Sequence, residues 1–206
     1  MGKDELERII ARIKFDFLKV MSGENIVSEG EKSGQLMLLV DGEVEVQTYA
    51  HDNGYVVCEY LNAPYTLQPE RTFGLTQRYS STIKALTTCS LVCINKNEIL
   101  RLTSDSLIFR LNLLNTISTA LQKRLRQDWK GFPQNLNQRI VRFFISHCTY
   151  PAGRKVFKIK MARLARELND SRLHVSQVLN AMADDGLVIL SRGKIEIPSV
   201  EQLLEA

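Results

Sequence analysis

Residues 160–185, KMARLARELNDSRLHVSQVLNAMADD, carry the most specific pattern in the sequence. Apolar residues at three- and four-residue spacing predict two short helices joined by a tight turn. The first helix is expected to bury Leu164, Ala165 and Leu168, and the small Ala165 allows the two helices to approach closely. The second helix is expected to bury Leu173, Val175, Val178, Leu179 and Met182. The segment therefore predicts a helix-turn-helix.

The residues between the two helices have the types that a tight turn requires. Asn169 tolerates the left-handed backbone conformation expected in the turn better than most residues do. Ser171 can cap the second helix by accepting a hydrogen bond from a backbone N–H two or three residues further on. A turn this short sets the helices at a steep angle, so that the second one projects outward.

The outer side of the second helix has residue types that read DNA. With the apolar positions turned inward, the residues left outside are Arg172, His174, Ser176, Gln177 and Asn180. Arg and Gln form paired hydrogen bonds with the edges of guanine and adenine in the major groove. A polar outer face is common on any amphipathic helix, so the prediction of DNA binding also depends on the flanking residues.

Those flanks are basic and can contact phosphates. They comprise Lys160, Arg163 and Arg166 before the turn, and Arg192 and Lys194 after the second helix. Residues 186–198, GLVILSRGKIEIP, alternate around Arg192-Gly193 and predict an antiparallel hairpin. A hairpin at this point makes the motif a winged helix-turn-helix.

The charge distribution agrees with a polyanionic partner. From Arg139 onward Lys and Arg outnumber Asp and Glu by 11 to 7, whereas the first 138 residues hold 16 of each. The net charge of +4 therefore lies in the C-terminal third. Because phosphates supply most non-specific binding free energy, DNA is a suitable partner for this third.

A long helix is expected to precede this domain, capped by Ser104 or Asp105 and running to about Asp128. Its seam has heptad spacing and consists of Leu107, Leu111, Leu114, Ser118, Leu121 and Leu125. A helix of about 24 residues spans roughly 36 Å, which favours pairing with a second copy of the chain. A helix packed only on its own β-domain is the alternative. Gly131, Phe132 and Pro133 then end the helix.

The N-terminal half has the period-two pattern of short strands between about Asn25 and Asn95. The segments are QLMLLV, EVEVQTY, YVVCEYL, STIKAL and CSLVCI, separated by turns such as Asp41-Gly42 and HDNG. They predict an antiparallel sandwich or jelly-roll barrel. Residues 4–18 space Leu6, Ile9, Ile10, Ile13 and Phe17 as one helical stripe, and so predict an amphipathic helix before the strands.

Composition excludes several classes of protein. No apolar run approaches the roughly 20 residues of a membrane span, and the start of the sequence is unlike a signal peptide. Cys58, Cys89, Cys93 and Cys148 lie far apart without nearby histidines, so we expect buried thiols in a reducing cytoplasm and no metal site.

Over nearly its whole length the chain resembles the cyclic-AMP receptor protein and fumarate–nitrate regulator (Crp–Fnr) superfamily of bacterial transcription regulators. The likeness is carried by SEGEKSGQLMLLVDGEVEV, by DNGYVVCEYLN and CSLVCINKNEILRL, and by KIKMARLARELNDSRLHVSQVLNAM with SRGKIEI. The resemblance implies an α+β fold. Its three parts are a β-roll sensor domain similar to cyclic-nucleotide-binding domains (residues 1–103), a dimerisation helix (104–130) and a winged helix-turn-helix (131–206).

The resemblance also implies roles for individual residues. Ser171 and Arg172 begin the base-reading helix, and His174, Ser176 and Gln177 face the groove. Lys160, Arg192 and Lys194 fall where the family contacts the DNA backbone. A Glu and a second Arg common in the family are here Leu173 and Gln177, which implies a different preferred DNA sequence.

The sensor domain departs further from the family. In PERTFGLTQRYSSTIKAL, Gly74 is retained, but Thr72 stands where the family's ribose-binding Glu is expected. Tyr79 lies near the place of its phosphate-binding Arg, with Arg78 one residue away. Without a carboxylate for the ribose, cyclic AMP is disfavoured. Any effector is expected near Gly74, Arg78, Tyr79, Ser80 and Ser81, and its identity stays open.

Other chemistries lack the residues they need. The first 57 residues hold no cysteine for an iron–sulfur cluster, and His51 in the HDNG turn is the only histidine of the sensor domain, so neither a haem switch nor a cupin-type metal enzyme is expected. No cofactor is assigned. We expect a cytoplasmic homodimer on a roughly palindromic double-stranded DNA site, with RNA polymerase as a further partner. The alternative is a dimeric ligand-binding or protein-interaction scaffold whose helix-turn-helix does not read DNA.

Overall fold

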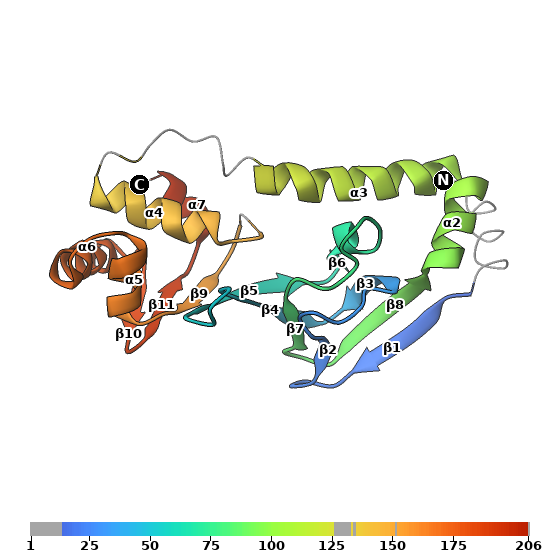
Figure 1. Ribbon diagram of the computed structural model, residues 1–206. Coiled ribbons are helices and arrows are strands. Elements are labelled where there is room, and N and C mark those ends of the chain that lie inside the picture. Colours follow the sequence, from blue (N-terminus) through green and yellow to red (C-terminus); the bar gives the residue numbers. More distant parts are fainter. Residues whose placement is uncertain (1–13, 126–132, 134, 151, 206) are drawn as a thin grey trace. The chain divides into compact units, whose positions relative to one another are not determined.

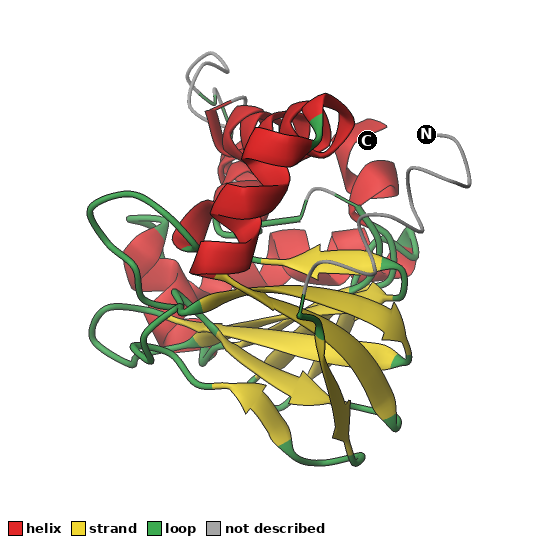
Figure 2. Ribbon diagram, turned by 90° about the vertical axis from the view of Figure 1, so that its right-hand side faces the viewer, coloured by secondary structure: helices red, strands yellow, loops and turns green. Residues whose placement is uncertain are grey.

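The computed structural model describes residues 14–125, 133, 135–150 and 152–205 (Figure 1). Helices and antiparallel strands both occur along the chain, which confirms the predicted α+β class (Figure 2). The chain divides into two compact units. The first holds the described residues of Met1–Val44 and Leu61–Gln122, and the second those of Glu45–Tyr60 and Lys123–Ala206. The segment Glu45–Tyr60, which lies within the predicted β-roll domain (residues 1–103), therefore packs with the C-terminal part.

Four antiparallel strands form one sheet of the first unit, in the order β1-β8-β3-β6. These strands are β1 (Asp16–Val20), β8 (Cys89–Asn95), β3 (Gln35–Asp41) and β6 (Tyr65–Leu67), and a further antiparallel pair joins β2 (Asn25–Val27) to β7 (Thr82–Ala85). The strands predicted at QLMLLV, STIKAL and CSLVCI are confirmed as β3, β7 and β8. Strands β2 and β6 were not predicted because three residues are too few for alternation to be recognised.

The helix predicted over residues 4–18 is wrong at its C-terminal end. Asp16–Val20 is strand β1, paired with β8 from Asp16 opposite Cys93 to Val20 opposite Cys89. Phe17, expected on the buried stripe, is 82% exposed. Backbone hydrogen bonds to the edge of β8 stabilise this segment as a strand. This tertiary pairing outweighs the local preference for a helix that the apolar spacing indicates. Leu6, Ile9, Ile10 and Ile13 lie outside the described residues.

A helix that was not predicted, α2 (Lys96–Asp105), comes first, and after the bend that Figure 1 shows the predicted long helix begins as α3 (Leu107–Leu125). Its cap is neither Ser104 nor Asp105. Ser106 has an extended backbone, and its hydroxyl accepts a hydrogen bond from the N–H of Phe109 at 3.2 Å. Ser104 instead donates its hydroxyl to the carbonyl of Leu100 within α2. The 19 residues of α3 span about 28 Å. The predicted continuation to Asp128 and the Gly131-Phe132 break lie outside the described residues.

One side of α3 packs on its own unit. Phe109 and Leu113 contact a buried cluster formed by Leu36 and Ile94 of the sheet and by Ile99 and Leu102 of α2. Among the described residues of the first unit, none covers the opposite side of α3, where Leu107, Leu111, Leu114 and Leu121 are exposed. One apolar side of α3 is thus packed on the first unit, and the other apolar side is exposed.

The second unit is a winged helix-turn-helix with an added hairpin. Its elements are α4 (Leu136–Ser146), β9 (Lys155–Lys158), α5 (Met161–Glu167), α6 (Arg172–Asp184), β10 (Ile189–Ser191), β11 (Lys194–Ile197) and α7 (Val200–Glu205). The hairpin comes from β4 (Glu43–Tyr49) and β5 (Val56–Asn62), which confirm the strands predicted at EVEVQTY and YVVCEYL. The strands run in the order β10-β11-β9-β5-β4, so β5 extends the sheet of the wing.

Candidate nucleic-acid interface

The helix-turn-helix forms as α5, a short turn and α6. Leu164, Ala165 and Leu168 are buried, as the sequence predicted, and Ala165 is 5% exposed where the helices meet. Asn169 has a φ of 50°, which confirms the left-handed conformation expected in the turn. From α6, Val175, Leu179 and Met182 enter the core, and Val178 is partly buried.

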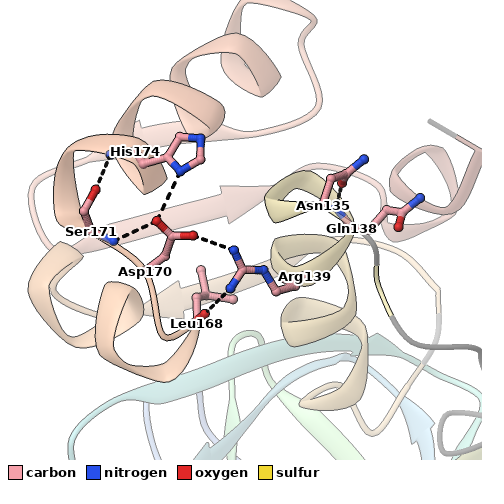
Figure 3. A network of polar contacts seen from close by, with 7 residues as sticks. All are labelled: Asn135, Gln138, Arg139, Leu168, Asp170, Ser171 and His174. Atoms are coloured by element: carbon pink, nitrogen blue, oxygen red, sulfur yellow. Dashed lines mark hydrogen bonds and ion pairs between the residues drawn. The ribbon is translucent and has the colours of Figure 1, made fainter.

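Ser171 caps α6, as predicted, because its Oγ accepts a hydrogen bond from the backbone N–H of His174 at 3.1 Å. Asp170, beside it, is the centre of a polar network (Figure 3). Its carboxylate accepts hydrogen bonds from the N–H of Ser171 at 2.8 Å and from Arg139 at 2.5 Å, and it contacts Nδ1 of His174 at 3.1 Å. The N–H of Ser171 first, and then His174 and Arg139, hold the pKa of the Asp170 carboxyl below its ordinary value.

Arg139 links this turn to α4. One guanidinium nitrogen donates to the carbonyl of Leu168 at 2.8 Å while another pairs with Asp170, so α4 supports the start of α6 (Figure 3). This role of Arg139 and Asp170 was not predicted from the sequence. The two residues are 31 positions apart, and nothing in the local pattern relates them.

The outward face of α6 has the predicted polar residues with one correction. Arg172, His174, Gln177 and Asn180 are exposed, and Ser176 is partly exposed. Within the described part of the chain no ion pair engages Arg172, which is therefore available to a ligand. Leu173 was expected in the core, but it is 71% exposed. The prediction was wrong because residue 173 lies about half a turn from the buried positions.

The flanking cations differ in availability. Lys160 and Arg166 are exposed, and Arg192 is exposed in the turn of the wing, where Gly193 has a φ of 71°. Lys194 instead lies 2.8 Å from Glu196. Arg163, expected to hold phosphates, is committed to ion pairs with Asp52 at 2.7 Å and with Glu167 at 2.5 Å.

The hairpin of β4 and β5 is anchored to the second unit by a buried ion pair. Glu59 of β5 and Lys155 of β9 are both fully buried, with the carboxylate 3.5 Å from the ammonium. The same carboxylate accepts hydrogen bonds from the N–H groups of Thr149 and Tyr150, each at 2.9 Å. Burial raises the pKa of Glu59, against the lowering effect of Lys155 and the two amides. Nothing in the sequence pattern indicated this pair.

The residues named as an effector site follow one another in a single loop of the first unit, and several are engaged within the chain. Arg78 donates to the carbonyl of Gly30 at 2.7 Å, and Tyr79 is 4% exposed. Both the N–H and the hydroxyl of Ser80 donate to the side-chain oxygen of Gln68. Ser81 is buried, whereas Gly74 faces open space. An effector at these residues stays a prediction.

The predicted seam of α3 lies on the side of the helix that the described residues of its own unit leave uncovered. Leu107, Leu111, Leu114 and Leu121 are 49–59% exposed, and the side chain of Leu125 is outside the described residues. The four cysteines are buried, as expected. Among the described residues, no His, Cys, Asp and Glu side chains cluster as a metal site, and none of the helices has the length and hydropathy to cross a bilayer.

These features define a class: a protein with an antiparallel β-roll, a long helix and a winged helix-turn-helix. The model of the cyclic nucleotide-binding domain matches residues 17–106, and that of the Crp-like helix-turn-helix domain matches residues 138–206. The matches cover about three quarters of the chain. The chain belongs to the Crp–Fnr superfamily of transcription regulators.

Solved structures share this fold. The c-di-GMP-responsive global regulator CLP of Xanthomonas campestris is 18% identical, with a TM-score of 0.53 over 96% of this chain and 99% of that one. Reduced CprK without ligand is 13% identical, with a TM-score of 0.53 over 99% and 98% of the two chains. A transcriptional regulator of Thermotoga maritima is 14% identical, with a TM-score of 0.50 over 57% and 89%. A comparison with curated protein sequences finds no match.

Proposed function

We propose that the chain is a homodimeric transcription regulator that reads a specific double-stranded DNA sequence through α6. The observation that carries the proposal is the outward face of α6, where Arg172 in the first turn and Gln177 near the middle are exposed on a helix that Ser171 caps. These two residue types form paired hydrogen bonds with guanine and adenine. Exposed Lys160, Arg166 and Arg192 on both sides supply cations for the phosphates.

Dimerisation is proposed through the uncovered side of α3. Its exposed leucines repeat at heptad spacing, and burying them against a second copy removes apolar surface from water. Two copies related by a two-fold axis present two α6 helices to successive major grooves, about 34 Å apart. The operator is therefore expected to be roughly palindromic. The β-roll is proposed either to sense an unidentified small effector, which shifts the dimer between two arrangements, or to leave DNA binding constitutive.

The experiment that tests this function is in vitro selection of DNA from a random pool by the purified protein with no ligand added. Enrichment of a two-fold symmetric site supports the proposal. Enrichment only after addition of cyclic AMP or cell extract would show that DNA binding requires an effector. Arg172→Ala should weaken binding to the enriched site by about 1–3 kcal/mol without lowering stability. Lys19→Ala, which removes an exposed cation from β1, is the control and should bind normally.

The competing function is a dimeric scaffold whose helix-turn-helix contacts a protein. The dependence of binding on salt concentration distinguishes the DNA-binding function from the protein-binding scaffold. Each phosphate contact should lower the logarithm of the binding constant by about 0.9 per tenfold rise in salt, whereas an apolar protein contact depends weakly on salt. Absence of any enriched DNA under all three selection conditions would favour the scaffold.

A further inference from the structure

Leu173 lies at the centre of the outward face of α6. Successive residues of an α-helix are rotated by about 100°, so Leu173 lies about 180° from the buried Met182. It shares its side of the helix with Gln177, four residues on, and Asn180, seven residues on, and both are exposed. With 71% of its surface in water, Leu173 contributes little to the core of the second unit.

The position of Leu173 limits what it can contact. It lies in the first turn of α6, two residues after the Ser171 cap, and the N-terminal residues of such helices contact base edges in the major groove. That groove displays hydrogen-bond donors and acceptors and a single apolar group, the C5-methyl of thymine. A leucine side chain cannot satisfy a donor or acceptor, and it would leave such a group without water. The thymine methyl is the group that suits it.

We propose that Leu173 determines specificity by contacting the C5-methyl group of a thymine in each half-site. This inference rests on the proposed function, because it requires α6 to enter the major groove. Arg172 and Gln177 select bases by hydrogen bonds, and Leu173 adds one position selected by an apolar contact. The operator is therefore expected to hold a thymine at one position of each half-site.

The test uses the full-length protein and its selected operator, with each thymine replaced in turn by deoxyuridine. Uracil keeps the hydrogen-bonding groups of thymine and lacks only the methyl. Burying one such group is worth about 0.8 kcal/mol, and 1.4 kcal/mol corresponds to a tenfold change, so binding of one altered half-site should weaken about fourfold. Leu173→Ala should bind the thymine operator more weakly and should not distinguish thymine from uracil at that position.

Two variants serve as controls. Gln177→Ala should bind more weakly yet keep the fourfold preference for thymine at the same position. Leu204→Ala removes an exposed leucine of α7 in the same unit and should change neither affinity nor preference. All variants should unfold at the urea concentration of the wild type.

The outcomes separate the two proposals. If the wild type selects an operator but tolerates uracil at every position, the role of Leu173 is refuted. The same holds if Leu173→Ala retains the preference for thymine over uracil. Neither result contradicts the proposed function as a DNA-binding regulator. If the wild type selects no DNA under any condition, the proposed function fails and the inference fails with it.

Discussion

The Ser171 hydroxyl caps the N-terminus of α6. Ser171→Ala removes the acceptor for the N–H of His174 and should lower the free energy of unfolding by about 0.5–2 kcal/mol. Urea denaturation measures this loss. Ser191→Ala, an exposed serine at the end of β10, is the matched control and should change the free energy by less than about 0.5 kcal/mol. Equal stabilities of the two variants would contradict the assigned cap.

Glu196 of the wing makes stability depend on pH. Hydrogen bonds from Arg154 and Lys194 lower the pKa of the Glu196 carboxyl from 4.5 to about 2. Because the pKa is lowered in the folded state, the stabilisation is complete above pH 4.5 and is lost as the pH falls toward 2. Glu196→Gln should therefore be less stable than the wild type at pH 6, and the difference should shrink below pH 4.5. Urea denaturation at a series of pH values checks this, and a difference independent of pH would refute it.

At the scale of elements, the hairpin of β4 and β5 is joined to β9 by the buried pair of Glu59 and Lys155. Lys155→Met leaves the Glu59 carboxylate buried without its cation and should destabilise the protein by about 3–5 kcal/mol. Glu59→Gln combined with Lys155→Met removes both charges and should recover part of that loss. Denaturation of the two variants measures the difference. A double variant no more stable than Lys155→Met would show that the pair does not act as a unit.

The elements also show which parts of the fold were predictable. Helix α6, the wing hairpin and the longer strands follow from periodicity and turn residues, and all were predicted. Strand β1 was predicted as the end of a helix, because residues 16–18 continue an apolar helical spacing whereas their partner β8 lies about 70 residues further on. Helix α2 was not predicted because Asn95, which ends β8 and caps α2 by accepting a hydrogen bond from the N–H of Glu98, is equally typical of a turn.

At the scale of the whole molecule, the function depends on two copies of the chain. Leu114→Glu places a charge in the proposed seam of α3, where Leu114 is 55% exposed in the single chain. Sedimentation velocity should find a monomer, and affinity for the selected operator should fall because two half-sites are no longer bound together. Leu100→Glu, equally exposed at 55% on α2, should remain dimeric. A dimeric Leu114→Glu would place the interface elsewhere.

The sequence by itself determined the order of the parts, the helix-turn-helix with its Asn169 turn and Ser171 cap, and the basic C-terminal third. These features follow from periodicity, backbone preference and charge, which act over a few residues. Tertiary structure alone decided that Glu45–Tyr60 packs with the second unit, that Arg163 is neutralised by Asp52, and that Leu173 is exposed. Pairing between distant residues and the direction of each side chain depend on which surfaces meet, and local pattern does not contain that information.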